Sequence, residues 1–93
     1  MATETGTVNN DTLTGTAGAD ILYGLAGDDL FYGLAGSDSV YGGEDGDLIY
    51  GGDGTDSLYG DAGADTLYGN DGSGGLLARN TIYGGTGADL MYG

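Results

Sequence analysis

Cysteine, histidine, proline and lysine are all absent from the 93-residue sequence, and Arg79 is the only basic residue. Without cysteine there is no disulfide framework, and without cysteine or histidine there is no thiolate or imidazole site for zinc or copper. The same absences remove the usual nucleophiles and proton-transfer groups, so we expect no enzymatic activity. The lack of proline suits strands that pair with neighbours on both sides.

Basic charge is almost absent, and 15 acidic residues give the chain a formal net charge of −14. A chain this acidic repels nucleic acid and anionic membranes and attracts cations. No apolar run approaches the length of a membrane span, and residues 1–10 lack the charged and apolar regions of a signal peptide. We therefore expect no nucleic-acid partner, no membrane insertion and no Sec-type export signal in this chain.

The 23 glycines follow a strict nine-residue period instead of being scattered. From Gly15 to Tyr68 the chain reads GTAGADILY, GLAGDDLFY, GLAGSDSVY, GGEDGDLIY, GGDGTDSLY and GDAGADTLY without a gap. Each unit has glycine at position 1, aspartate at position 6, an apolar residue at position 8 and tyrosine at position 9. A period this regular predicts stacked units of a single design.

The same register extends in both directions from this block. GTVNNDTLT (6–14) fits upstream and GGTGADLMY (84–92) fits downstream, while the 15 residues from 69 to 83 are one repeat with GGLLAR (74–79) inserted and Asn80 in place of aspartate. Nine repeats thus form one domain, residues 6–93, after a tail at residues 1–5. We interpret the insertion as surface slack or as a cap over a coil end.

Positions 1–6 of each unit have turn chemistry, and positions 7–9 have strand chemistry. Because side chains alternate along a strand, position 8 points to one face and positions 7 and 9 to the other. Position 8 is apolar in every repeat, so we predict that it faces the interior. Its residues are Leu13, Leu22, Phe31, Val40, Ile49, Leu58, Leu67, Ile82 and Met91.

Two turns and two short strands complete a coil of 18 residues, and successive coils stack as parallel strands about 4.8 Å apart. Alternate repeats then lie above one another, and their aspartates form two rows. One row would hold Asp11, Asp29, Asp47, Asp65 and Asp89, and the other Asp20, Asp38 and Asp56 with Asn80. Stacked carboxylates repel one another unless a cation lies between them.

Only carboxylate and carbonyl oxygens are available as ligands, and these suit hard cations. Turns that offer many carbonyls in flexible geometry favour Ca²⁺ over Mg²⁺. An EF-hand is excluded because Glu4 and Glu44 are the only glutamates and neither ends such a loop. A glycine-rich chain with a small core and repelling aspartates is expected to be largely unfolded without metal and folded with it.

The repeat resembles the GGxGxDxUx nonapeptide of RTX (repeats-in-toxin) proteins, and the resemblance covers residues 6–92. It implies an all-β fold, a right-handed parallel β-roll with one Ca²⁺ between each pair of stacked turns. It also implies a protein that is secreted from bacteria by a type I system and folds outside the cell.

In that family the earlier turn supplies its aspartate and the carbonyls of positions 2 and 4, and the later turn its aspartate and the carbonyls of positions 1 and 3. Carried over to this chain, the resemblance implies at most seven ions held by the row aspartates and by backbone carbonyls. The carbonyl residues are Thr7, Asn9, Thr16, Gly18, Gly24, Leu25, Ala26, Gly27, Gly33, Leu34, Ala35, Gly36, Gly42, Gly43, Glu44, Asp45, Gly51, Gly52, Asp53, Gly54, Gly60, Asp61, Ala62, Gly63, Gly69, Asp71, Gly84 and Thr86.

Two departures from the pattern weaken particular sites. Asn9 in the first turn weakens the first site mildly, and Asn80 brings no charge to the site that it shares with Asp56. Position 2 is glycine only at Gly43, Gly52 and Gly85, which a carbonyl ligand with ordinary φ tolerates. The alternative to calcium binding is a structural or adhesive solenoid whose exposed face binds a partner or a surface. We interpret the position-9 tyrosines as sheet-stabilising neighbours, and open coil ends make an end-to-end homo-oligomer a hypothesis.

Overall fold

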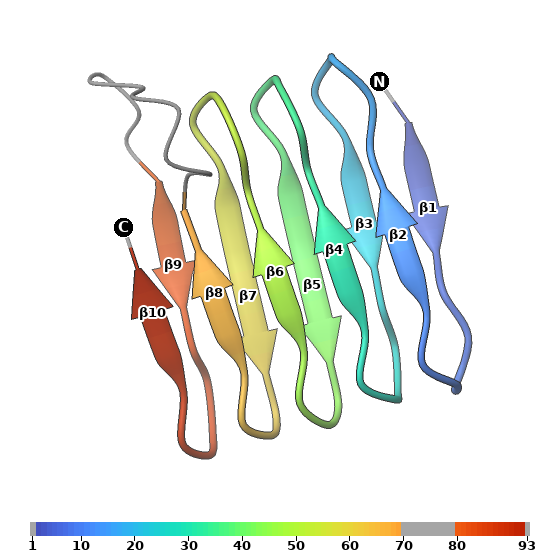
Figure 1. The fold of residues 1–93 in the computed structure, drawn as a ribbon, viewed down its shortest axis with the longest axis vertical. Helices are drawn as coiled ribbons and strands as arrows, with labels where there is room; N and C mark the ends of the chain where they lie inside the picture. The colour runs from blue at the N-terminus through green and yellow to red at the C-terminus, as the bar shows by residue number, and fades with distance from the viewer. Residues whose placement is uncertain (1, 70–79, 93) are drawn as a thin grey trace.

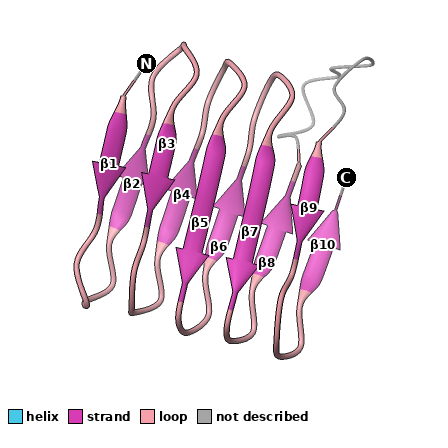
Figure 2. Cartoon of the chain, turned by 180° about the vertical axis from the view of Figure 1, so that it is seen from behind, coloured by secondary structure: helices cyan, strands magenta, loops and turns pink. Residues whose placement is uncertain are grey.

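The computed structural model describes residues 2–69 and 80–92, and every regular element in this part of the chain is a β-strand. Two five-stranded parallel sheets face one another, with strand order β1-β3-β5-β7-β9 in one and β10-β8-β6-β4-β2 in the other (Figures 1 and 2). The strands are β1 (Thr3–Thr5), β2 (Thr12–Thr14), β3 (Ile21–Tyr23), β4 (Leu30–Tyr32), β5 (Ser39–Gly43), β6 (Leu48–Tyr50), β7 (Ser57–Asp61), β8 (Thr66–Tyr68), β9 (Thr81–Tyr83) and β10 (Leu90–Tyr92).

Strand register confirms the 18-residue coil. Ile21 pairs with Ser39, and Ser39 pairs with Ser57, so each strand lies beside the strand one coil later. Consecutive strands alternate between the two sheets, so the chain winds as a β-solenoid (Figure 1). All ten strands include positions 7–9 of a repeat or the equivalent residues, where β-branched, aromatic and large apolar side chains favour extended backbone.

The register beyond the insertion is also continuous. Ser57 pairs with Thr81 and Thr66 pairs with Leu90, so these partners are 24 residues apart instead of 18. The difference of six equals the number of residues in the predicted insertion 74–79, which itself lies outside the described residues together with Asp71. The stacking of β9 on β7 therefore does not require a regular nonapeptide between them.

Position 8 forms the core, as predicted, in the middle of the chain. Seven of its side chains are buried, six of them with no exposed surface, and Ile82 packs partly buried against them. The prediction is wrong for Met91, which is 50% exposed because β10 is an edge strand with a neighbour, β8, on one side only. Residues 1–5 were expected as a tail, but Thr3–Thr5 pair with β3 and place the charged Glu4 beside Leu22 in the position-8 register.

Most turns place positions 2 and 4 in the left-handed region of backbone space. Where position 2 is glycine this is expected, and a Cβ at Gly43 would collide with the carbonyl oxygen of Leu25 in the preceding stacked turn. Four residues with side chains adopt the same conformation, with φ between 70° and 73°: Leu25, Leu34, Asp45 and Asp61. These positions carry backbone strain that glycine would not.

Replacing Leu34 with glycine is therefore expected to stabilise the fold by about 0.5–1 kcal/mol, since left-handed backbone costs an L-residue roughly 1–2 kcal/mol. Leu34 has φ 73° and is 46% exposed, so the change removes little packing. Denaturant unfolding at fixed calcium concentration measures the effect. Leu90→Gly is the matched control, because Leu90 is 52% exposed in a strand, where glycine weakens the structure. Equal destabilisation by Leu34→Gly and Leu90→Gly would show that the backbone at Leu34 is not strained.

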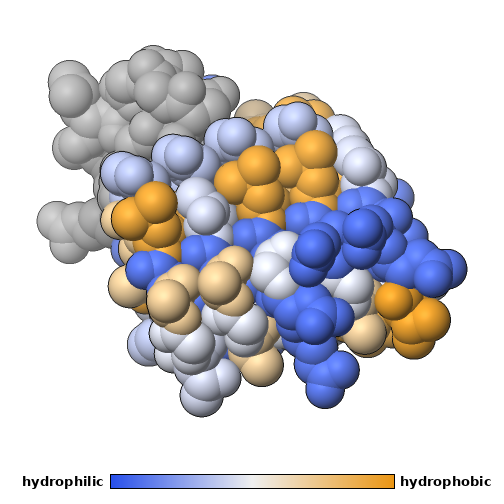
Figure 3. Space-filling view, turned by 60° about the horizontal axis from the view of Figure 1, so that its bottom comes forward, coloured by the Kyte–Doolittle hydropathy of each residue, from blue (hydrophilic) through white to orange (hydrophobic). Residues whose placement is uncertain are grey.

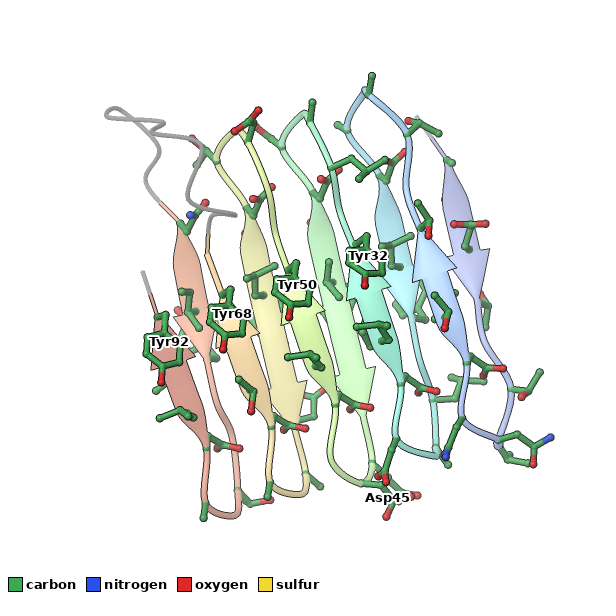
Figure 4. The ribbon with its side chains drawn as sticks, viewed as in Figure 1. Tyr32, Asp45, Tyr50, Tyr68 and Tyr92 are labelled. Carbon is green, nitrogen blue, oxygen red and sulfur yellow. The ribbon has the colours of Figure 1, made fainter. Side chains whose placement is uncertain are left out.

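The position-9 tyrosines form two ladders, one on the outer face of each sheet. Within a ladder the ring centroids are 4.8–5.4 Å apart and the planes lie 3–10° from parallel. Figure 4 shows the ladder of Tyr32, Tyr50, Tyr68 and Tyr92 running across its sheet. The stacking adds to strand pairing. The described residues include no helix long and apolar enough to span a membrane.

Candidate cation-binding turns

The turns lie along two edges of the solenoid. The first edge holds turns 6–11, 24–29, 42–47, 60–65 and 84–89, and the second holds turns 15–20, 33–38 and 51–56, with Asn80 beside Asp56. Figure 3 brings the first edge forward and shows hydrophilic residues running across it. The predicted aspartate rows are confirmed, because each position-6 residue is hydrogen-bonded to the position-6 residue one coil away.

A backbone hydrogen bond links the members of each row. The amide N–H of each row aspartate donates to Oδ1 of the aspartate one coil later, for example from Asp29 to Asp47 at 2.8 Å and from Asp38 to Asp56 at 2.8 Å. Asn80 joins the second row in the same way, since its Oδ1 accepts from the amide of Asp56 at 2.7 Å. One oxygen of each of these side chains is thus satisfied by the protein, which the sequence did not reveal.

The second carboxylate oxygen has no hydrogen-bond partner in the central turns. Oδ2 is buried and unpartnered in Asp29, Asp38, Asp47, Asp56 and Asp65. These five side chains are at most 3% exposed. A buried carboxylate oxygen without a donor is costly, and burial of a charge is compensated by pairing, by a metal ion or by protonation.

Each of these Oδ2 atoms lies beside the position-1 glycine of its own turn, where a backbone carbonyl of the next stacked turn also approaches. A Cβ on Gly42 would lie 2.5 Å from Oδ2 of Asp47 and 2.9 Å from the carbonyl oxygen of Gly60. Seven position-1 glycines show this convergence of their own aspartate and the next stacked turn, with both contacts under 3.0 Å: Gly6, Gly15, Gly24, Gly33, Gly42, Gly51 and Gly60. A Cβ would collide with both oxygens, so these positions require glycine. In five of these turns the Oδ2 atom has no hydrogen-bond donor, which makes the pair of oxygens attractive to a cation.

Burial raises the pKa of the central carboxyls in the metal-free fold. The pKa is raised from about 3.8 to about 7 for Asp38 and Asp47, and to about 6 for Asp56 and Asp65. Loss of hydration is the largest cause, the hydrogen bond from the preceding aspartate amide opposes it, and neighbouring carboxylates add repulsion. Burial also raises the pKa of Asp29. These five aspartates are therefore held in an environment that penalises their charge.

The two N-terminal turns satisfy their aspartates differently. The amide of Thr7 donates to Oδ2 of Asp11 at 2.6 Å, and the amide of Thr16 donates to Oδ2 of Asp20 at 2.6 Å. Each threonine hydroxyl also donates to both oxygens of the same carboxylate. The Thr16 amide is the main reason why the pKa of Asp20 is lowered although the side chain is buried.

The predicted carbonyl ligands lie in the seams between stacked turns. The carbonyls of Leu25, Gly43 and Asp61 accept hydrogen bonds of 2.8–3.1 Å from position-3 amides of the next turn. The position-4 carbonyl of Asp45 points at Gly63 in the next turn. The described residues contain no group of three or more acidic side chains at metal-binding distance. Any ion held here must therefore rely on backbone carbonyls, and the ligand sets remain a prediction.

The side chains of two other acidic residues also link turns, which the sequence analysis did not predict. Oδ1 of Asp28 accepts from the amide of Gly46 at 3.0 Å, and Oδ2 of Asp45 accepts from the amide of Gly27 at 3.1 Å. Both residues are exposed, and Figure 4 shows Asp45 at the tip of its turn. These side chains stabilise the stacking at the rim of the turn, outside the buried aspartate row.

Comparison with known proteins agrees with this geometry. A family model described as the RTX calcium-binding nonapeptide repeat, four copies long, matches residues 5–40, 41–76 and 75–93. No curated protein and no solved structure matched the chain. The matched segments cover nearly all of the sequence, with the glycine turns and aspartate rows inside them. The chain therefore belongs to the family of RTX calcium-binding nonapeptide repeats.

Proposed function

We propose that the chain is a calcium-binding β-roll module that folds when Ca²⁺ binds between stacked turns. The observation that carries the proposal is the set of five buried, unpartnered aspartate Oδ2 atoms in the central turns. Each meets a backbone carbonyl of the next coil in a space that only glycine leaves open. A divalent cation would supply the missing partner and remove the repulsion within the rows.

Calcium suits this arrangement better than other common ions. The donors are carboxylate and carbonyl oxygens on a backbone seam, and Ca²⁺ accepts six to eight oxygens in flexible geometry, whereas Mg²⁺ keeps its waters. The central site on the first edge would use Asp47 and Asp65 with the carbonyls of Gly43, Asp45, Gly60 and Ala62. The corresponding second-edge site would use Asp38 and Asp56 with the carbonyls of Leu34, Gly36, Gly51 and Asp53.

A circular dichroism titration of metal-free protein with Ca²⁺, and with Mg²⁺ in parallel, tests the proposal. We expect a cooperative change from coil to β-structure with Ca²⁺ alone, in the range of about 10⁻⁴–10⁻³ M that is typical of extracellular modules. A chain that is fully β-structured in chelator at neutral pH, with no response to Ca²⁺, would overturn calcium-driven folding. The alternative function, an adhesive solenoid that binds a partner through its exposed tyrosine ladders, would then be favoured.

Low pH is expected to replace calcium in part, because protonation of the buried aspartates stabilises the metal-free fold. The carboxyls of Asp38, Asp47, Asp56 and Asp65 have a higher pKa in the metal-free fold than near 3.8 in the unfolded chain, so protons favour folding. This stabilisation is complete below pH 3.8 and is lost as the pH rises through about 6 to 7. In metal-depleted buffer the chain should show more β-structure at pH 5 than at pH 8.

Calcium binding should respond to pH in the opposite direction, because the ion needs ionised carboxylates. The calcium midpoint of the same titration is expected to rise as the pH falls from 8 to 5. Identical metal-free spectra at the two pH values, together with an unchanged midpoint, would show that the buried aspartates do not control folding.

The family fits a role outside the cell, where calcium is abundant. RTX repeats are typical of secreted bacterial proteins, and we propose that this module is extracellular, has no catalytic activity of its own and has calcium ions as its partners. The edge strand β10 exposes about half of Leu90, Met91 and Tyr92. These residues make end-to-end association in calcium a further proposal, and a strictly monomeric light-scattering mass at high concentration would contradict it.

A further inference from the structure

The solenoid contains two kinds of turn with nearly the same sequence. Turn 15–20 reads GTAGAD, whereas turns 24–29 and 33–38 read GLAGDD and GLAGSD. The threonine turn differs from both leucine turns at positions 2 and 5. Position 5 also differs between the two leucine turns, so position 2 is what distinguishes the two kinds of turn. With leucine at position 2 the backbone enters the left-handed region at positions 2 and 4, whereas Thr16 and Gly18 are not among the described residues with positive φ.

The threonine turns leave no unmet acceptor on their aspartates. Oδ2 of Asp20 receives the Thr16 amide at 2.6 Å and the Thr16 hydroxyl at 3.2 Å, and Oδ1 receives the Ala2 amide at 2.8 Å. Asp11 has the same two donors from Thr7 on its Oδ2. In the left-handed turns the corresponding Oδ2 atoms of Asp29 and Asp38 have no donor.

We propose, on the basis of the calcium function above, that Thr7 and Thr16 close two of the seven candidate sites, so that the chain binds at most five Ca²⁺ ions. An ion between stacked turns must contact Oδ2 of the earlier aspartate. In the threonine turns it would have to displace an amide and a hydroxyl donor, and the amide would then lose its partner. The sites left open are Asp29–Asp47, Asp47–Asp65, Asp65–Asp89 and Asp38–Asp56. The pair Asp56–Asn80, which has one carboxylate instead of two, is a fifth at most.

Because the sites at Thr7 and Thr16 are closed, the N-terminal end of the solenoid is held together without metal. The first coil pairs through β1 and β3, and Asp11 and Asp20 are satisfied by hydrogen bonds. The next three coils each contain at least one aspartate whose Oδ2 lacks a donor: Asp29 and Asp38, Asp47 and Asp56, and Asp65. Position 2 is thus the residue that decides whether a turn takes an ion, and threonine there selects the metal-free form.

The number of bound ions tests the inference. Equilibrium dialysis at saturating Ca²⁺ with metal analysis should give at most five ions per chain for the wild type and one more for Thr16→Leu, which converts the turn to GLAGAD. Thr16→Ser keeps the hydroxyl and the amide donor and should bind the same number of ions as the wild type. Circular dichroism of each saturated variant establishes that it is folded, and Thr16→Gly replaces the leucine variant if that variant does not fold.

The outcomes separate this inference from the calcium function itself. Six or seven ions in the wild type, or no gain over the wild type in a folded Thr16→Leu or Thr16→Gly variant, would overturn the role of threonine while leaving calcium binding intact. No bound ion in the wild type would overturn the proposed function. A gain of one ion in the leucine or glycine variant, with the serine variant unchanged, would support the assignment of position 2.

Discussion

Replacing Asp47 with asparagine is expected to raise the calcium midpoint of folding by at least about tenfold, the order of loss seen when even an indirect partner of a metal is removed. Asp47 is 3% exposed and lies in the middle of the first-edge row, between Asp29 and Asp65. It belongs to two adjacent candidate sites, so the loss of one charge weakens both. Asparagine keeps the shape and an oxygen for the Asp29 amide, so the change isolates the second carboxylate oxygen and its charge.

The matched control is Glu44→Gln in the same turn. Glu44 is an exposed acid at position 3, where only the backbone carbonyl is a predicted ligand. Glu44→Gln makes the same change in net charge as Asp47→Asn. The calcium midpoint should nevertheless shift by less than about twofold, because exposed charges are well screened. Equal shifts in the two variants would mean that calcium responds to net charge instead of to the row.

The metal-free state gives a second distinction for Asp47→Asn. In chelator the wild-type fold must bury a carboxylate whose Oδ2 has no partner, and the pKa of that carboxyl is raised to about 7. Asparagine removes this charge, so the variant should not lose β-structure in chelator relative to wild type. A variant that is less folded both with and without calcium would indicate general damage to the turn.

Periodicity was sufficient to predict most of the fold, for a physical reason. A strict nine-residue repeat allows one turn and one strand per unit, so the side-chain alternation of a strand determines that position 8 is inside. Leu22, Phe31 and Val40 are fully buried, as that argument requires. Register across the insertion was also predictable, because the repeats on both sides must bury the same face.

The details that the sequence did not reveal depend on how one turn lies on the next. The amide of Asp29 donates to Asp47, a contact between residues one coil apart that is invisible within a repeat. Left-handed backbone at Leu25 was not expected, because the stacking imposes it against the residue's own preference. Thr16 looked like an ordinary position-2 residue, although a hydroxyl and an amide near an aspartate four residues later are a recognisable turn signal.

The exposed end of the solenoid shows the limit of the same reasoning. Met91 has the sequence position of a core residue, yet it is half exposed on the edge strand β10, whereas Phe31 at the same position is fully buried. Position in the repeat determines which face a side chain takes. The number of neighbouring coils determines whether that face is covered, and this is a property of the stack.

Truncating Phe31 to alanine is expected to cost about 3–5 kcal/mol of the free energy of unfolding, the range for deleting a buried phenylalanine side chain. Phe31 heads the fully buried side chains when these are ranked by volume, and it lies between Leu13 and Ile49 in its sheet. A Cβ on Gly24 would lie 2.5 Å from its Cζ, so the ring fills the space beside that turn. Denaturant unfolding at saturating calcium measures the loss, and the calcium midpoint should rise because folding and binding are coupled.

Met91→Ala is the control for Phe31→Ala, because both residues occupy position 8 and differ in burial. The side chain of Met91 is 50% exposed, so its truncation should cost less than about 0.5–1 kcal/mol. A large difference between the two variants would show that the stack of position-8 side chains, and not the calcium seams alone, holds the two sheets together. Similar small losses of unfolding free energy in the two variants would mean that the ions and the turn hydrogen bonds provide most of the stability and that core packing contributes little.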